Sequence, residues 1–318
     1  MEPTLDPQKA QDLENGVNQG VVEPTEEELA QTGDVAGASI IAPDSNIDSF
    51  LSDFDPQSNP NFDTLGCNIF SGIGGLELQI NARGGDGELS VNGKAELSER
   101  KACVDCGLTG NAGSSEGQWE HGINEYGFVR NDLWPFTPGM TKAQFFSDPS
   151  PQIMALGKRA LDRYDIIHRP VGTDDASLKE ALKYGAVKVF IGTGPGWNVG
   201  EPNVVPKTNN PMNHAVLLRK FSDLGKHIRD QYAPFLKVLA PDYIIYYAFQ
   251  TLLIPKGQSM PFVKSTLNLD GAVGVFLAAG EGTNVDPSIL QDLNSIFGTN
   301  LQQHADGSIP TDKTAHSA

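Results

Sequence analysis

Three residues with the chemistry of acyl transfer lie far apart in this sequence, each at the edge of an apolar segment. Cys67 directly precedes a segment with helical apolar spacing, and a helix N-terminus favours a thiolate over a thiol. His214 enters an apolar strand-like segment after a flexible loop, and Asp230 follows 16 residues later. A thiolate, an imidazole and a carboxylate can act as nucleophile, general base and a group that orients the base.

Each of these residues also has an ordinary structural interpretation. Free Cys is usually buried as a small hydrophobe. A His at the edge of a strand is commonly a hydrogen-bonded structural residue, and an Asp in a turn is commonly solvated. Taken one at a time, Cys67, His214 and Asp230 leave both interpretations open.

Other motifs argue against other kinds of site. The loop GTGPGWNVG (192–200) lacks the Lys-Ser/Thr of a phosphate-binding loop, and SGIGGLE (71–77) lacks the spacing of a dinucleotide fingerprint. Cys103 and Cys106 form a lone CxxC with no second Cys pair or nearby His pair, so we expect no zinc site. SERKA, before this CxxC, is not the strand that a thioredoxin-like redox motif needs.

The segments that must position these residues are helical early and strand-rich late in the chain. A helix over 67–82 contains Gly72, Gly74 and Gly75, so it must be buried and closely packed. Further helices are predicted at 115–126, 150–160 and 177–184, and strands at 165–171, 186–192, 215–218 and 243–254. The pattern predicts an α+β fold with two lobes.

Charge and composition exclude several partner classes. The 318 residues carry a net charge of -17, which disfavours nucleic acid and anionic membranes. No apolar run approaches the roughly 20 residues of a membrane span, and the N-terminal residues lack the features of a secretory signal. Three cysteines are too few for a disulfide framework.

The acidity is concentrated in the N-terminal segment. Residues 1–55 hold 13 Asp or Glu and one Lys, with no aromatic residue before Phe50. Such a segment buries too little apolar surface to offset its ordering entropy. We therefore predict a disordered tail over 1–49, a folded domain over 50–255, and an extension over 256–318 with a strand pair at 262–277 and a helix at 287–297.

Four stretches in order resemble the papain-like (C1-type) cysteine peptidases, of the divergent kind found in phage and environmental genomes. They are QSNPNFDTLGC (57–67), ALKYGAVKV (181–189), NHAV (213–216) and RDQYAPF (229–235). Cys67 and His214 are 147 positions apart, within the roughly 130–150 residues of the papain-type Cys-to-His order. The resemblance covers about two thirds of the chain and implies a helical lobe beside an antiparallel β-sheet or barrel lobe.

The resemblance also implies roles for the site residues. Cys67 would be the nucleophile, His214 the general acid and base, and Asp230 the residue that orients the imidazole. Gln57 and the Cys67 backbone N–H would donate to the oxyanion, and no metal or cofactor is required. The sequence departs from the family in lacking the C-G-S-C-W signature, in having Asp230 in place of Asn, and in the ten-residue gap between Gln57 and Cys67.

Three functions follow from this comparison. The first is a thiol peptidase that forms a thioester intermediate and takes a protein or peptide substrate. The second is a catalytically weak or inactive papain-fold structural or interaction protein of a phage virion, whose acidic tail contacts other virion subunits. The third is a Cys-His cell-wall endopeptidase or amidase. A cytoplasmic or virion-associated location is expected for all three.

Overall fold

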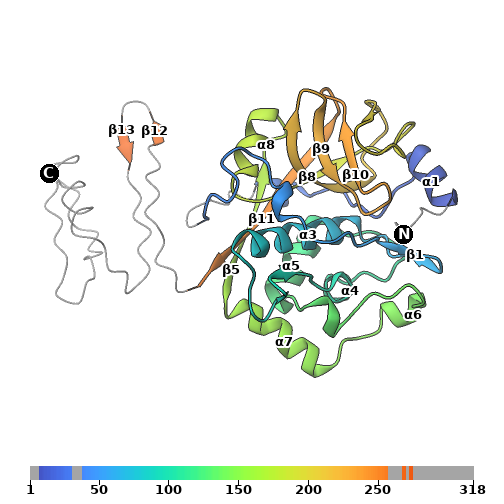
Figure 1. The fold of residues 1–318 in the computed structure, drawn as a ribbon, viewed down its shortest axis with the longest axis vertical. Coiled ribbons are helices and arrows are strands. Elements are labelled where there is room, and N and C mark those ends of the chain that lie inside the picture. Colours follow the sequence, from blue (N-terminus) through green and yellow to red (C-terminus); the bar gives the residue numbers. More distant parts are fainter. Residues whose placement is uncertain (1–6, 31–37, 257–266, 270–271, 275–318) are drawn as a thin grey trace, which may run out of the picture. The chain divides into compact units, whose positions relative to one another are not determined.

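The computed structural model describes residues 7–30, 38–256, 267–269 and 272–274 (Figure 1). One compact unit extends from Met1 to Lys256 and a second from Gly257 to Ala318. In the second unit, β12 (Leu267–Leu269) and β13 (Ala272–Gly274) pair antiparallel, within the predicted strand pair. The helix predicted at 287–297 lies outside the described residues.

A seven-stranded sheet forms one half of the first unit, in the order β5-β11-β6-β8-β9-β10-β7. Its pairs are antiparallel except for β10 with β7, which are parallel. The strands are β5 (Tyr164–Val171), β6 (Val187–Ile191), β7 (Val204–Val205), β8 (His214–Ser222), β9 (Gly225–Arg229), β10 (Leu236–Leu239) and β11 (Ile245–Pro255).

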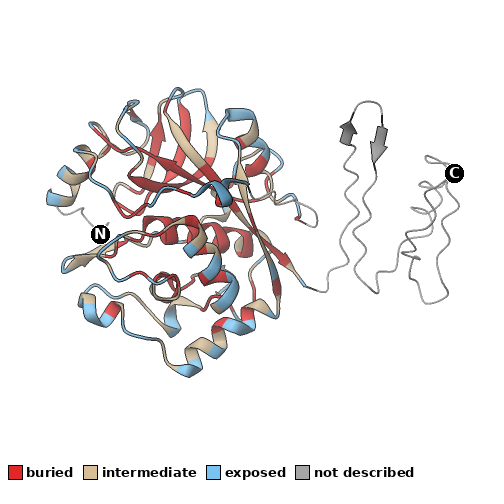
Figure 2. Ribbon diagram, turned by 180° about the vertical axis from the view of Figure 1, so that it is seen from behind, coloured by how far each residue is buried: buried red, intermediate tan, exposed pale blue. Residues whose placement is uncertain are grey.

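Helices form the other half, and the central one is α3 (Cys67–Ala82), which begins and ends as predicted. It packs against β8 and β11, and Figure 2 shows it almost wholly buried. A Cβ at Gly72 would lie 2.6 Å from the Trp119 ring, so a glycine is needed for this contact. The prediction of a buried, closely packed helix is confirmed.

The remaining elements are short. The helices are α4 (Glu99–Asp105), α5 (Glu116–Tyr126), α6 (Lys142–Phe145), α7 (Pro151–Leu161) and α8 (Asp175–Leu182), with the 3-10 turns η1 (Asp48–Phe50) and η2 (Asn131–Leu133). Two small hairpins pair β1 (Ser58–Asn59) with β2 (Phe62–Asp63) and β3 (Ser90–Val91) with β4 (Lys94–Ala95). Most of the helices pack in one half and the mainly antiparallel sheet forms the other, with α8 packed beside the sheet, so the predicted α+β class is confirmed (Figure 1).

The N-terminal segment is folded where the structure describes it, which corrects the expectation of a disordered tail. It contains α1 (Pro7–Glu14) and α2 (Glu26–Ala30), and Leu13, Val21 and Ile47 are buried. Composition alone underestimated its packing, because a few apolar anchors and many backbone hydrogen bonds hold it. Among the described residues, no helix is both long and apolar enough to cross a membrane.

Candidate active site

Cys67 is the first residue of α3 and is fully buried. Burial raises the pKa of its thiol to about 12, although a hydrogen bond from the Ala215 backbone N–H acts to lower it. Cys67 and Ala215 belong to one buried cluster with Val21, Phe190 and Phe249. The nucleophile candidate therefore lies against β8 at Ala215, the residue after His214, and in this state its thiol is protonated and not hydrogen-bonded to His214 Nδ1.

His214 and Asp230 form a buried pair between β8 and the end of β9. Nε2 of His214 lies 2.7 Å from Oδ1 of Asp230, and both side chains are inaccessible to solvent. Because an ionised carboxylate only accepts hydrogen bonds, Nε2 carries the hydrogen. Nδ1 of His214 is buried without a hydrogen-bond partner. In the neutral imidazole this nitrogen is an unprotonated acceptor, which is the form that a general base needs.

The charge of Asp230 is compensated within the protein. Its Oδ2 accepts hydrogen bonds from Lys237 Nζ at 2.7 Å and from Trp197 Nε1 at 3.0 Å, and the backbone N–H of Gln231 donates to Oδ1 at 2.7 Å. Burial raises the pKa of Asp230, but attraction to Lys237 and to His214 outweighs burial and holds the pKa well below its usual value. Asp230 is therefore a fixed carboxylate and not a solvated turn residue.

Two aromatic rings flank the imidazole of His214. The Trp197 ring meets it edge-on at 5.7 Å and the Tyr232 ring lies at 5.6 Å, both between centroids. Sequence reasoning did not single out Lys237, Trp197 or Tyr232. Lys237 follows Asp230 by seven positions, and the antiparallel turn between β9 and β10 brings the two residues together. A prediction of that turn is the one signal in the sequence that would have pointed to Lys237.

Residues 19–22 lie across the site, between the two halves of the unit. The Gln19 N–H donates to Asn213 O at 2.7 Å, on the residue before His214. On the other side, Ser114 N–H donates to Gly20 O at 3.1 Å and Val22 N–H to Ser114 O at 3.2 Å. Val21 packs in the cluster that contains Cys67. We call residues 18–22 the covering segment.

The covering segment is held by close contacts and by α1. Gly20 has φ +104°, and a Cβ there would lie 1.8 Å from Leu65 O, so only glycine fits. At the end of α1, the Glu14 carboxylate accepts from Gly196 N at 2.6 Å and from Asn198 N at 3.3 Å. Acidic residues of the N-terminal region thus bind loops of the same chain.

Gln57, predicted as an oxyanion donor, is buried beside the covering segment. Its Nε2 donates to Gln19 O at 3.3 Å, to Asp63 Oδ1 at 3.0 Å and to the Tyr232 hydroxyl. The amide therefore reaches a backbone carbonyl of the segment that covers Cys67. Its Oε1 is buried without a partner.

Cys103 and Cys106 are free and buried in the helical half. Burial raises the pKa of both thiols above the usual value. Among the described residues, they belong to no group of three or more side chains that could hold a metal ion.

Comparison with known proteins gives matches in structure but not in sequence. No protein family model matches the chain, and no curated protein matches it. Bromelain from Ananas comosus, solved with the inhibitor E64, is 15% identical with a TM-score of 0.44, over 64% of this chain and 94% of that chain. The ragweed cysteine protease Amb a 11, in its proform, is 16% identical with a TM-score of 0.46, and the match covers 70% of this chain and 72% of that chain. Digestive procathepsin L 3 of Tenebrio molitor is 15% identical with a TM-score of 0.44, and the match covers 77% of this chain and 78% of that chain.

The chain is structurally similar to papain-like cysteine peptidases. These similarities concern the course of the backbone. The function proposed below therefore depends on the geometry of Cys67, His214 and Asp230.

Proposed function

We propose that this protein is a thiol peptidase in which Cys67, His214 and Asp230 act together on a peptide bond. The observation that carries the proposal is the buried His214–Asp230 pair, 2.7 Å between Nε2 and Oδ1, which leaves Nδ1 of His214 without a hydrogen-bond partner. A structural His would have its second nitrogen satisfied. Cys67 is the proposed nucleophile, and its thiol accepts a hydrogen bond from the backbone N–H of Ala215, the residue after His214.

The chemistry follows from these positions. Nδ1 of His214 takes the thiol proton as the Cys67 sulfur attacks the substrate carbonyl carbon, and the resulting imidazolium gives that proton to the leaving amine. Water, deprotonated by His214, then hydrolyses the thioester and releases the acid and the free thiol. Asp230 keeps the imidazole oriented throughout. Gln57 Nε2 donates to the carbonyl oxygen as it gains charge, in the place where it now contacts Gln19 O.

The described form is the covered form of this enzyme. A peptide cannot reach a fully buried thiol, and the thiol is protonated with a pKa of about 12. Displacing the covering segment would hydrate the site and remove the burial that raises this pKa. Cleavage of peptides therefore requires that residues 18–22 leave Asn213 and Ser114.

The test uses a substitution that the covering segment cannot accommodate. Gly20→Ala places a Cβ against Leu65 O, whereas Gly87→Ala adds a Cβ where no atom lies within 4 Å. We expect the full-length Gly20→Ala chain to cleave a casein or random-peptide substrate faster than the Gly87→Ala control. Adding Cys67→Ser should abolish this cleavage, and adding Cys103→Ser should leave it unchanged.

The complete burial of Cys67 also favours a second candidate, a protein with a papain-like fold that no longer cleaves peptides. A folded Gly20→Ala chain that exposes Cys67 and still cleaves nothing would support this second function over the first.

A further inference from the structure

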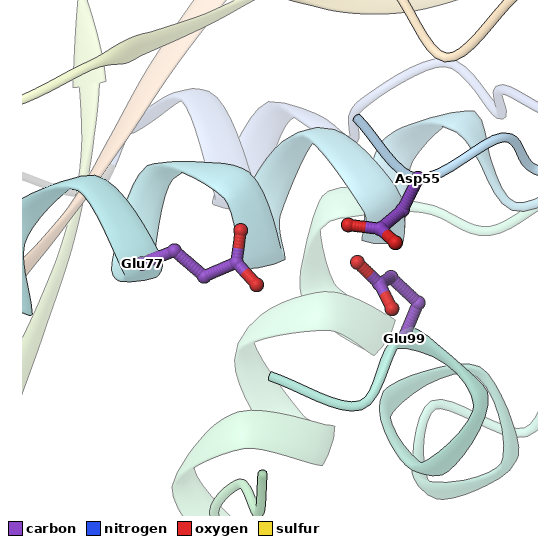
Figure 3. Close-up of side chains that lie close together, drawn as sticks. All are labelled: Asp55, Glu77 and Glu99. Carbon is purple, nitrogen blue, oxygen red and sulfur yellow. The ribbon is translucent and has the colours of Figure 1, made fainter. Parts of the chain in front are cut away.

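Three carboxylates from separate segments converge beside the candidate active site (Figure 3). Asp55 precedes Gln57 in the chain, Glu77 lies on α3, and Glu99 is the first residue of α4. One oxygen from each lies within 4.8 Å of the others. Figure 3 shows Asp55 and Glu99 facing one another, with the Glu77 carboxylate pointing toward both. We call these three residues the carboxylate cluster.

The three carboxyl groups of the cluster share one neighbouring guanidinium. Arg229 is the cation at its edge, 4.0 Å from both Asp55 Oδ2 and Glu77 Oε2. Its guanidinium donates to Ser52 Oγ at 2.8 Å and to the backbone carbonyl of Asp53. Three ionised carboxylates beside one guanidinium leave a net charge of -2. Burying such a charge without compensation is strongly unfavourable.

The carboxylates are held in place by their neighbours. Glu77 accepts from Ser52 Oγ at 2.5 Å and from Leu97 N at 2.7 Å, one bond on each oxygen. Each carboxylate oxygen still has a free lone pair, since a carboxylate accepts about four bonds.

A further polar side chain, that of Gln231, lines the same space. Gln231 is 5% exposed, and its Oε1 is buried without a hydrogen-bond partner, while its Nε2 donates to Ser71 Oγ at 2.6 Å. Gln231, Asp55 and Glu99 line one small cavity of about 10 Å³. An unsatisfied amide oxygen beside carboxylates supplies a further acceptor and no donor.

We propose that the carboxylate cluster and Gln231 Oε1 bind a divalent cation, with Ca²⁺ the best match. All the ligands are oxygens, which suits the hard cations Ca²⁺ and Mg²⁺ and disfavours zinc. Each carboxylate can coordinate the ion through one oxygen or through both. Together with the amide oxygen and a water, the three carboxylates supply the six to eight ligands of Ca²⁺. A divalent charge offsets the net charge of -2.

The ion has a route to the cluster. Asp55, Glu99 and Gln231 also line a larger pocket of about 590 Å³, whose walls include Phe136, Tyr232 and Phe235. An ion entering through this pocket meets the Asp55 and Glu99 carboxylates and Gln231 at its inner end, with Arg229 on the far side of the small cavity. The bound cation would tie together the chain before Gln57, α3, α4 and the residue after Asp230. Its role is structural, and peptide cleavage as proposed above takes no step through it.

Binding is measured on the full-length Cys67→Ser chain, so that cleavage plays no part. After treatment with EDTA, Ca²⁺ is added during calorimetric titration, and the thermal midpoint is followed in parallel. We expect one Ca²⁺ per chain and a midpoint that rises with Ca²⁺. Glu99→Gln should weaken the affinity about tenfold or more, because it removes a charged ligand at nearly constant shape. The matched control is Asp223→Asn, an exposed carboxylate, which should bind as the parent does.

The EDTA-treated Glu99→Gln chain provides a check on folding. Loss of one like charge should leave its midpoint equal to or above that of the EDTA-treated parent, so lost binding would not reflect lost structure. The proposal is overturned if Ca²⁺ and Mg²⁺ neither bind the parent nor move its midpoint, which would mean that the cluster holds protons. It is also overturned if Glu99→Gln binds Ca²⁺ as tightly as Asp223→Asn does.

Discussion

Asp230→Asn should strongly destabilise the full-length chain, because it breaks an ion pair from which solvent is excluded. Asp230 and Lys237 are both 0% exposed, and the Nζ–Oδ2 distance is 2.7 Å. Removing one partner leaves a buried ammonium, which costs about 3–5 kcal/mol. At about 2–4 °C per kcal/mol for a chain of this size, the thermal midpoint should fall by roughly 6–20 °C.

Urea unfolding measures this loss against two reference variants. Asp242→Asn breaks an exposed pair with Lys207, in which the side chains are 71% and 41% exposed, and should cost less than about 1 kcal/mol. Asp230→Asn combined with Lys237→Met removes both charges and should recover much of the loss. A single Asp230→Asn variant as stable as Asp242→Asn, or a double variant no more stable than the single one, would refute the reasoning.

The same residue should make stability depend on pH. The pKa of Asp230 lies below its unfolded value of 3.8, so its contribution is fully present above that pH. The contribution is lost as the pH falls below 3.8 toward the folded pKa. The stability of the parent should therefore fall more steeply than that of Asp230→Asn in this acidic range, as followed by urea midpoints at successive pH values.

Three further outcomes are expected. Gly72→Ala should lower the free energy of unfolding in urea by about 1–3 kcal/mol, because its Cβ would lie 2.6 Å from the Trp119 ring. Gly75→Ala, whose Cβ would have its nearest neighbour at 3.6 Å, should leave this free energy unchanged or raise it. Equal losses of stability in the two variants would contradict this packing. Glu14→Gln should loosen α1 from Gly196 and Asn198 and speed alkylation of Cys67, and an unchanged rate would show that Glu14 does not hold the covering segment. Alkylation of Cys67 in the unaltered chain should rise about tenfold per pH unit between pH 7 and 9, because only the thiolate reacts and its pKa is about 12; a plateau near pH 7 would contradict the raised pKa.

The sequence was informative where apolar periodicity and local chemistry agree. A helix from Cys67 to about residue 82 was predicted because most of its apolar spacings are helical, and the structure has it at Cys67–Ala82. His214 and Asp230 were singled out from the edges of strand-like segments, and the structure brings them together at 2.7 Å. By contrast, β9 and β10 carry charged residues such as Lys226 and Lys237 that are buried by specific partners. These buried charges interrupt the apolar pattern, and their partners Asp175 and Asp230 lie outside the two strands, so periodicity could not reveal the strands.

The largest error concerned the N-terminal segment. Its acidic composition indicated solvation, yet Glu14 binds backbone N–H groups of a loop and Glu28 binds that of Gly117 at the start of α5. Carboxylates used as hydrogen-bond acceptors for backbone groups cannot be told from solvated ones by composition. The coverage of Cys67 followed from these contacts and could not be read from the spacing of the site residues.

The most direct test of the proposed site is labelling of the full-length chain with an epoxysuccinyl thiol probe, with each adduct located by mass spectrometry. In the Gly20→Ala chain the probe should modify Cys67 and spare Cys103 and Cys106, while in the Gly87→Ala chain it should modify Cys67 far more slowly. Adding an excess of casein should slow the labelling of Cys67, since both occupy the uncovered site. A Gly20→Ala chain in which Cys67 stays unmodified, or in which all three thiols react at equal rates, would contradict the assignment of Cys67 as a nucleophile beneath residues 18–22.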